Sequence, residues 1–457
     1  MKKSPDRSLL AFLIFLSVVS VFYLLGVPQV PFHPDESTQL FTSGDAELFW
    51  KQLGALFWQP DQEDDLRQRY RELDAPLTRN IIALSRWIAG QPSVPVDWDW
   101  GESWEENRLT GALPTAGQLQ AGRMGVAALF PFSLLFLFLA VRRATNSFTA
   151  WTAALLLATN ALVLLHTRRA MAEGPLLFAT TFSLWSLSKA EKRPWLTGIP
   201  LALAFCAKQT LAALAPIGLL AVLWQPGGGS QPGGGSQPGS GNQRGRKRIL
   251  RAGGQALAFA ACFILVTALL YPFAWQRPIP AVRAAIQARS ALAAAQTGDR
   301  PDQALATPDR KIIAMLGSLY LTPPIFAETG NYTQETAAAE AAYLANPLHA
   351  LLRSLPAGGI LLATGIFGYL IALRQFFANR NINDPRRRRM GLFLLASLFQ
   401  TLALLALVPL PWQRYYLPLM PFCCFWTAYG LNQLIRIGSL RRSSADPARR
   451  AAHHPGT

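Results

Sequence analysis

Long runs of apolar residues alternate with short basic segments along most of the chain. An α-helix needs about 20 mainly apolar residues to cross the hydrocarbon core of a membrane, and several runs have this length. The pattern therefore predicts about ten membrane-spanning helices. Their expected residues are 9–27, 123–141, 148–165, 170–187, 196–207, 210–224, 252–275, 351–373, 390–410 and 415–435.

Residues 196–224 fit either one long helix or two short ones, because Lys208 lies at the centre of the segment. A charged side chain is costly in hydrocarbon. With two short spans, the basic run 244–248 falls in the cytoplasm, as the positive-inside rule requires. The same count gives every cytoplasmic segment a positive charge and places both termini in the cytoplasm, so we prefer two spans.

Two long polar segments separate the predicted spans, and we name residues 28–120 the first outer loop and residues 276–346 the second outer loop. In the first, apolar residues recur at helical spacing in 45–58 and 78–89. We expect interfacial helices there, although a small soluble cap is an alternative. Residues 1–436 would form the transmembrane domain, with a flexible cytoplasmic linker at 225–251, rich in Gly, Ser, Pro and Gln, and a basic cytoplasmic tail at 437–457.

Composition supports an all-α polytopic membrane protein. Hydrophobic residues make up 51% of the chain and charged residues only 15%, whereas soluble proteins carry about 25% charged residues. The net charge of +17 is spread over short loops and forms no single basic face, so we expect no nucleic-acid partner. The four cysteines lie in apolar runs without the spacing of a zinc site, and we assign them neither disulfide nor redox chemistry.

The strongest local signal for chemistry is His33-Pro34-Asp35-Glu36, just after the first span. Adjacent carboxylates repel, so one is expected to have a raised pKa unless a cation or a metal ion intervenes. This arrangement suits a general base or a metal ligand. An acidic pair at a helix start can also be only a cap, and the sequence leaves both readings open.

Further charged residues fall on the same predicted outer face. Arg168, Arg169 and Glu173 join two spans, Lys208 lies between two short ones, and Arg414 opens the last span. Charged side chains at this depth are costly and are often functional, although salt bridges between helices are an alternative. Several cations beside acids would suit an anionic, membrane-borne substrate, because arginine binds phosphate in a bidentate manner.

With these residues the chain resembles the GT-C membrane glycosyltransferases that use polyprenyl-phosphate sugars, in particular the protein O-mannosyltransferase and aminoarabinose transferase branch. The resemblance rests on short motifs spread over most of the chain. These are Asp35-Glu36, Ala75-Pro76-Leu77, the group Arg168, Arg169 and Glu173, and Arg414-Tyr415-Tyr416-Leu417-Pro418. Two positions depart from the family pattern, because the usual Pro-Pro-Leu is Ala75-Pro76-Leu77 and many members have Asp where this chain has Glu173.

The resemblance implies transfer of a hexose or pentose to an acceptor hydroxyl at the outer face of a bacterial cytoplasmic membrane. Asp35 would be the general base, with Glu36 supporting it or, with Glu173, holding a divalent ion such as Mg²⁺ or Mn²⁺. The implied substrate-binding residues are His33, Arg168, Arg169, Glu173, Lys208, Arg414 and Tyr415. The acceptor could be a protein, a glycolipid or a polysaccharide, and membrane lipids would surround the protein.

Two other functions fit the same spans. A transporter or lipid flippase would need polar residues near the membrane midplane and an internal repeat of spans. The sequence has no convincing repeat, and most charges lie at predicted helix ends. An inactive scaffold with the same fold is the third reading.

Overall fold

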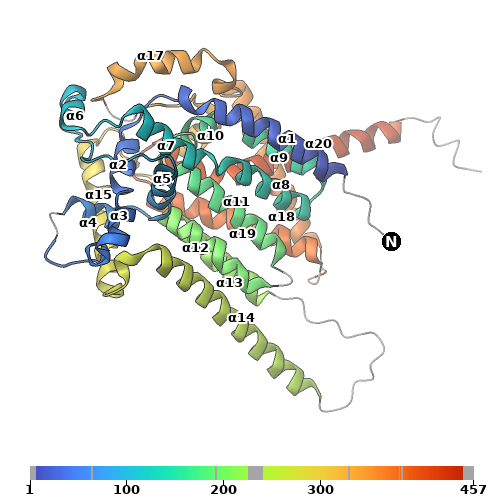
Figure 1. Ribbon diagram of the computed structural model, residues 1–457. Helices are drawn as coiled ribbons and strands as arrows, with labels where there is room; N and C mark the ends of the chain where they lie inside the picture. Colours follow the sequence, from blue (N-terminus) through green and yellow to red (C-terminus); the bar gives the residue numbers. More distant parts are fainter. Residues whose placement is uncertain are drawn as a thin grey trace, which may run out of the picture.

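A computed structural model describes residues 7–62, 65–190, 193–224, 240–327, 330–379, 381 and 384–445. Every regular element among these residues is a helix, and none of them lies in a β-strand. This confirms the all-α class. The apolar helices pack side by side, and the short helices that follow α1 gather at one end of the bundle (Figure 1).

The first third of the chain consists of one long helix and the short helices of the first outer loop. Its elements are α1 (Arg7–Leu25), η1 (Val27–Gln29), α2 (Pro34–Thr42), α3 (Asp45–Lys51), η2 (Leu53–Leu56), α4 (Leu66–Leu73), α5 (Leu77–Ile88) and α6 (Trp104–Thr110). Helix α1 runs along the bundle. Helix α2 begins at the end of the bundle opposite the N-terminus of α1 (Figure 1).

The central part of the chain builds most of the bundle. Its elements are α7 (Ala116–Ala127), α8 (Phe130–Ala144), α9 (Ser147–Ala158), α10 (Ala161–His166), α11 (Glu173–Lys189), η3 (Pro194–Thr197), α12 (Gly198–Ala207), η4 (Gln209–Leu214) and α13 (Ala215–Leu223). Helix α8 packs on both α9 and α11 within the largest apolar core, which includes Leu137, Phe138 and Leu177, all with 0% exposure.

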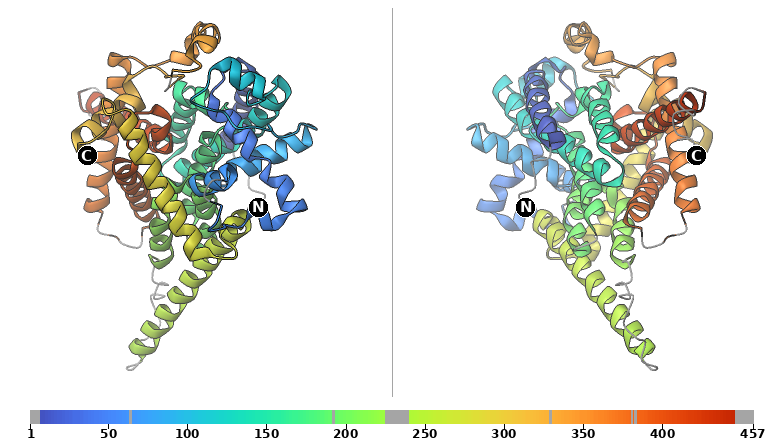
Figure 2. Two further views of the ribbon diagram at one scale, coloured as in Figure 1. Left: turned by 90° about the vertical axis from the view of Figure 1, so that its left-hand side faces the viewer. Right: turned by 90° about the vertical axis from the view of Figure 1, so that its right-hand side faces the viewer.

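The remaining helices complete the bundle and the second outer loop. They are α14 (Ser240–Leu270), η5 (Pro272–Ala274), α15 (Pro278–Asp299), α16 (Pro308–Leu316), the π-helical η6 (Gly317–Leu321), α17 (Thr333–Leu344), η7 (Pro347–Ala350), α18 (Leu355–Ala378), α19 (Pro385–Leu407), η8 (Gln413–Leu419) and α20 (Met420–Ala445). Helix α14 leans away from the bundle in both views of Figure 2, and among its side chains at 249–270 only Phe259 is buried.

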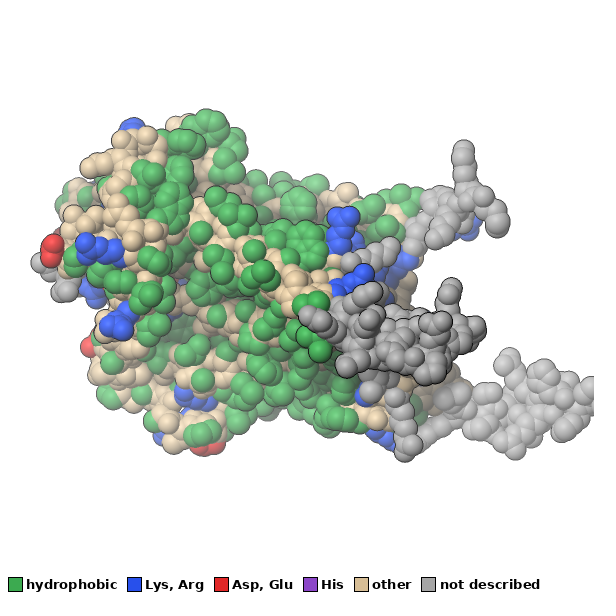
Figure 3. Space-filling model, turned by 90° about the horizontal axis from the view of Figure 1, so that it is seen from below, with side chains coloured by type: hydrophobic (Ala, Val, Ile, Leu, Met, Phe, Trp, Pro, Cys, Tyr) green, Lys and Arg blue, Asp and Glu red, His purple; other side chains and the backbone are tan. Residues whose placement is uncertain are grey.

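Five helical segments are long and apolar enough to cross a membrane: Arg7–Gln29, Ala116–Ala144, Ile249–Leu270, Leu355–Ala378 and Pro385–Leu407. Their lipid-facing side chains include Ile14 and Phe22, which are exposed. Apolar side chains cover the middle of the face in Figure 3, and acidic side chains occur only towards its left. The protein is therefore an integral membrane protein, but the structure does not confirm the count of ten spans, because the other predicted spans are shorter or interrupted helices.

The segment 196–224 is broken at Lys208, which has an extended backbone between α12 and η4. The alternative of one continuous helix is therefore wrong.

The structure changes part of the expectations for the linker and the C-terminal tail. Residues 225–239 and 446–457 lie outside the described residues, whereas α14 already begins at Ser240 and α20 continues to Ala445. The end of the predicted linker and the start of the predicted tail are thus helical, consistent with the high helix propensity of Arg, Lys, Leu and Gln.

The helices of the first outer loop have an apolar face that the protein leaves uncovered. Trp50 on α3 is 84% exposed, and Trp87 on α5 is 79% exposed. Opposite faces of these helices are buried and held by Asp45, which pairs with Arg71 at 2.9 Å and with Arg79 at 3.0 Å. Exposed tryptophans are typical of the membrane interface, so this arrangement favours interfacial helices over a soluble cap.

Glycines allow α18 and α20 to approach closely. A Cβ atom on Gly430 would lie 2.1 Å from the carbonyl oxygen of Thr364, and one on Gly368 would lie 2.1 Å from that of Trp426. Small residues at such crossings let helix backbones pack in a membrane. The crossing helps to hold α20, and with it η8, in the bundle.

We expect Gly430→Val to destabilise the protein by about 1–3 kcal/mol or more, because the new side chain meets backbone rather than a movable side chain. Gly359→Val is the matched control, since a Cβ at this α18 position has no neighbour within 4 Å. Thermal unfolding in detergent should show a lower midpoint for Gly430→Val alone. Equal midpoints for the two variants would contradict the close crossing.

Candidate functional site

The segment after α1 turns sharply into α2 and caps it. His33 is the N-cap: its Nδ1 accepts a hydrogen bond from the Asp35 amide at 3.1 Å, and the Glu36 side chain accepts one from the His33 amide, also at 3.1 Å. Pro34 occupies the first helical position, where a missing N–H costs nothing. The helix-cap reading of this motif is therefore correct for His33 and Glu36.

Glu36 is fully buried, with 0% exposure, and both of its carboxylate oxygens are engaged. Arg123 on α7 donates two hydrogen bonds of 2.7 Å to it, and the Ala170 amide donates a third of 2.8 Å. Burial raises the pKa of Glu36, but Arg123 and these hydrogen bonds lower it by more, so the net pKa is below its usual value. Glu36 thus ties α2 to α7 and to the turn before α11.

Asp35 points away from this pair and towards η8. Its side chain is 32% exposed and forms an ion pair and a hydrogen bond with Arg414. Burial alone would raise the pKa of Asp35, but the positive charge of Arg414 and its hydrogen bond lower that pKa further than burial raises it. Asp35 is therefore an ionised, partly accessible carboxylate, held by a residue 379 positions away in the chain.

A second acid and cation lie beside this contact. Lys208, at the break between α12 and η4, approaches Glu173 at 3.5 Å. Its Nζ also lies 5.1 Å from the ring centroid of Tyr415, and the Arg414 guanidinium lies 5.8 Å from the same ring. Tyr415 therefore connects the two cations. The structure brings together five of the residues named as site candidates from the sequence, Asp35, Glu173, Lys208, Arg414 and Tyr415.

Arg168 and Arg169 are held apart from this cluster by other partners. Arg168 donates to the Tyr23 carbonyl at 3.0 Å and lies 3.3 Å from Nε2 of His349. Arg169 donates to the carbonyls of Pro31 and Phe326 at 3.2 and 3.1 Å. Arg168 joins η7 to the end of α1, and Arg169 joins the second outer loop to the segment after η1. Their described contacts are therefore structural rather than those of an open phosphate site.

Sequence reasoning missed His166, at the C-terminal end of α10. Its ring is 1% exposed, and neither nitrogen has a hydrogen-bond partner among the described residues. Arg169 and Arg414 are the charged side chains near the ring. His166 therefore offers a hydrogen-bond donor and acceptor beside the cationic cluster. Its sequence neighbours are apolar, so only the unpaired, buried ring identifies it.

Asp74 is a second acid that the sequence did not single out for chemistry. Its carboxylate accepts a hydrogen bond of 3.2 Å from Gln39, which lies one turn after Asp35 on α2. Burial raises the pKa of Asp74, and the negative charge of Asp35 adds to the rise even though nearby arginines oppose it. Asp35 and Asp74 thus have pKa values displaced in opposite directions, a pattern found where two carboxyl groups have different roles.

The expectation of a divalent metal ion does not fit these residues. Among the described residues, no group of three or more His, Cys, Asp or Glu side chains could hold a metal ion. Each acid proposed as a ligand already has a cation, Arg123 for Glu36 and Lys208 for Glu173. We therefore assign no metal to Glu36 or Glu173.

Residues 66–231 match the family model of the dolichyl-phosphate-mannose-protein mannosyltransferases. The match covers less than half of the chain and includes Glu173 and Lys208, but neither Asp35 nor Arg414. It confirms the resemblance to glycosyltransferases of this group that the short motifs indicated. No curated protein is significantly similar to the chain in sequence.

The fold is similar to crystal structures of the oligosaccharyltransferase of Archaeoglobus fulgidus. The form with Zn and sulfate is 14% identical, with a TM-score of 0.43 over 84% of this chain and 43% of that one. The form tethered to an acceptor peptide is 13% identical, with a TM-score of 0.49 over 95% and 51%. The present chain thus spans about half the length of these structures.

We expect Glu36→Gln to lower the unfolding free energy by about 3–5 kcal/mol, because it leaves the Arg123 charge buried without its partner. Glu105→Gln is the control, since it removes an ion pair with Arg108 in which both side chains are more than half exposed. Unfolding midpoints in detergent measure both effects. A Glu36→Gln protein as stable as the control would show that this pair does not hold the site together.

Proposed function

We propose that the protein transfers a sugar from a polyprenyl-phosphate donor to a hydroxyl group of a protein acceptor, at the non-cytoplasmic face of a bacterial cytoplasmic membrane. The observation that carries the proposal is the contact between Asp35 and Arg414, with Lys208 close by. It combines an accessible carboxylate, able to take a proton, with cations able to balance a phosphate. The matching family's description supports mannose as the sugar and protein as the acceptor.

In the reaction Asp35 removes the proton from the acceptor hydroxyl while the hydroxyl oxygen attacks the anomeric carbon of the sugar. The bond between that carbon and the phosphate oxygen breaks, and the phosphate leaves on the lipid. Arg414 and Lys208 stabilise the negative charge that develops on the phosphate. Glu36 positions Asp35 through α2 and does not contact the substrate. We assign to His166, whose ring nitrogens have no hydrogen-bond partner among the described residues, a hydrogen bond to a sugar hydroxyl.

We propose that the lipid chain of the donor occupies a cavity of the first outer loop. A mainly apolar cavity of about 580 Å³ lies between α3, α5 and the end of α14, with Trp50 and Trp87 at its wall. Arg79 lines the cavity and donates a hydrogen bond of 2.7 Å to the Asp74 carbonyl. Through Asp74 and Gln39, the polar end of the cavity is connected to the face of α2 that carries Asp35.

The pairing with Arg414 also suggests how the base becomes active. A carboxylate with a lowered pKa is a weak base, so the free enzyme holds Asp35 in a weakly basic state. A donor phosphate that binds Arg414 would draw the guanidinium away from Asp35. Burial would then dominate and raise the pKa of Asp35, strengthening the base only when the donor is present.

Asp35→Asn should abolish transfer, because an amide of the same shape cannot take the acceptor proton. The measurement is incorporation of labelled mannose from polyprenyl-phosphate mannose into a peptide acceptor by the purified protein. Asp61→Asn, an exposed substitution in the same outer loop, is the matched control and should keep full activity. Unchanged transfer by Asp35→Asn would exclude Asp35 as the base.

The pH dependence tests the exchange of Arg414 between Asp35 and the donor. At acidic pH the fall of kcat/KM reports the pKa of Asp35 in the free enzyme, and the fall of kcat reports its pKa in the donor complex. Because donor binding should raise this pKa, the fall of kcat should lie at higher pH. In Arg414→Gln, Asp35 loses its cation and its pKa rises. In the residual activity of this variant, the acidic fall of kcat/KM should therefore move to higher pH. Coincident falls of kcat/KM and kcat in the wild type, and no movement in the variant, would contradict the exchange.

A further inference from the structure

A buried arginine outside the Asp35 cluster has no acidic partner. Arg353 lies between η7 and α18 and is 8% exposed. Its guanidinium donates to the Ser318 carbonyl at 2.8 Å and to the Asn160 side chain at 3.1 Å. Both acceptors are neutral, and no carboxylate among the described residues lies within ion-pair distance of it. This contrasts with Arg71, Arg123 and Arg414, which all pair with acids.

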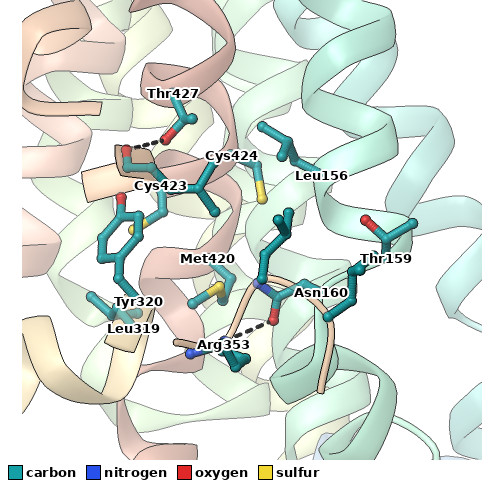
Figure 4. A pocket seen from close by; sticks show the side chains of 13 residues that line it. Leu156, Thr159, Asn160, Leu319, Tyr320, Arg353, Met420, Cys423, Cys424 and Thr427 are labelled. Atoms are coloured by element: carbon teal, nitrogen blue, oxygen red, sulfur yellow. Dashed lines mark hydrogen bonds between the residues drawn. The ribbon is translucent and has the colours of Figure 1, made fainter. Parts of the chain in front are cut away.

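Arg353 lines a cavity between α9, α18, η6 and α20. The accessible volume is about 40 Å³, room for a compact polar group or a few water molecules. Figure 4 shows Arg353 and Asn160 at one end of the cavity, and Tyr320, Cys423 and Thr427 towards the other. Arg353 is the one Lys, Arg, Asp or Glu among its lining residues, so the cavity has an uncompensated positive charge.

The backbone beside Arg353 is strained. Leu352 has a φ of 61°, and it is the one non-glycine residue with positive φ that the described chain contains. Leucine rarely adopts this conformation, because its Cβ crowds the backbone. Such strain persists where the surroundings demand it and is frequent at ligand sites. Here it turns Arg353 inwards while the Leu352 side chain remains 40% exposed.

The surroundings of the cavity face the membrane. Leu351 and Leu352, which line the cavity, are 36% and 40% exposed, and the neighbouring helices α9 and α18 belong to the apolar bundle. A buried charge is costly unless it is paired, and exposed leucines at a membrane contact lipid chains. A ligand that supplies an anion to Arg353 and hydrocarbon to these leucines satisfies both requirements.

We propose that Arg353 binds the phosphate of an anionic membrane phospholipid, whose acyl chains lie against the leucines at the mouth of the cavity. The site shares none of its lining residues with the Asp35 cluster, so it does not depend on the proposed transferase activity. It stands next to η7, whose His349 contacts Arg168. Lipid binding there would stabilise the second outer loop against α1.

Thermal unfolding of the full-length protein in neutral detergent tests the proposal. Added phosphatidylglycerol should raise the midpoint of the wild type by several degrees, whereas phosphatidylcholine and inorganic phosphate should not. Arg353→Gln should lose this response. Arg310→Gln, an exposed arginine of the second outer loop, should keep it. Equal shifts with both lipids, or a full response in Arg353→Gln, would overturn the proposal.

Inorganic phosphate distinguishes the source of the anion. If phosphate alone reproduced the shift, the site would bind a free anion and the lipid assignment would be wrong.

Native mass spectrometry of the wild type tests the same site without relying on the folding of Arg353→Gln. The wild type should retain phosphatidylglycerol in preference to phosphatidylcholine after delipidation, and Arg353→Lys should retain less of it. No preference in the wild type would refute the site independently of any variant.

Discussion

The buried ion pair between Glu36 and Arg123 is the interaction on which the site depends. It joins α2 to α7, and through the Ala170 amide it also fixes the turn before α11. Arg123 further donates to the Val30 carbonyl at 2.7 Å, which holds the chain between α1 and α2. With α2 fixed in this way, the next residue towards the N-terminus, Asp35, can only face η8.

The same principle recurs in the first outer loop. Acids in this loop that are shielded from water have a guanidinium or a hydrogen-bond donor beside them, as Asp45 does with Arg71 and Arg79. A buried charge pair contributes order only when its hydrogen bonds are complete. These ion pairs bury the polar sides of α3, α4 and α5. The apolar sides of α3 and α5, which carry Trp50 and Trp87, are exposed and can contact the membrane interface.

Interrupted helices bring the charged residues of the candidate site to one place. Helix α12 stops at Ala207, α10 stops at His166, and the 3₁₀ segment η8 carries Arg414 before α20 begins. Irregular backbone at membrane depth is tolerated where it is buried in protein or lines a cavity. The breaks thus explain both the shortness of several predicted spans and the position of the charged side chains, because a side chain at a helix end can leave the packed core.

The sequence by itself determined the class of fold and the break at Lys208, because both follow from the local apolar pattern and from the cost of a charge in hydrocarbon. It also singled out the adjacent acids Asp35 and Glu36, but it left open which of them is accessible. Tertiary structure alone separated the adjacent carboxylates, burying Glu36 on Arg123 and directing Asp35 to Arg414. It also moved Arg168 and Arg169 onto backbone carbonyls. Among the described residues, it left His166 without a hydrogen-bond partner and Arg353 without an acidic one. These outcomes depend on contacts between residues far apart in the chain. Such contacts decide how each buried charge is compensated, and no local sequence pattern contains them.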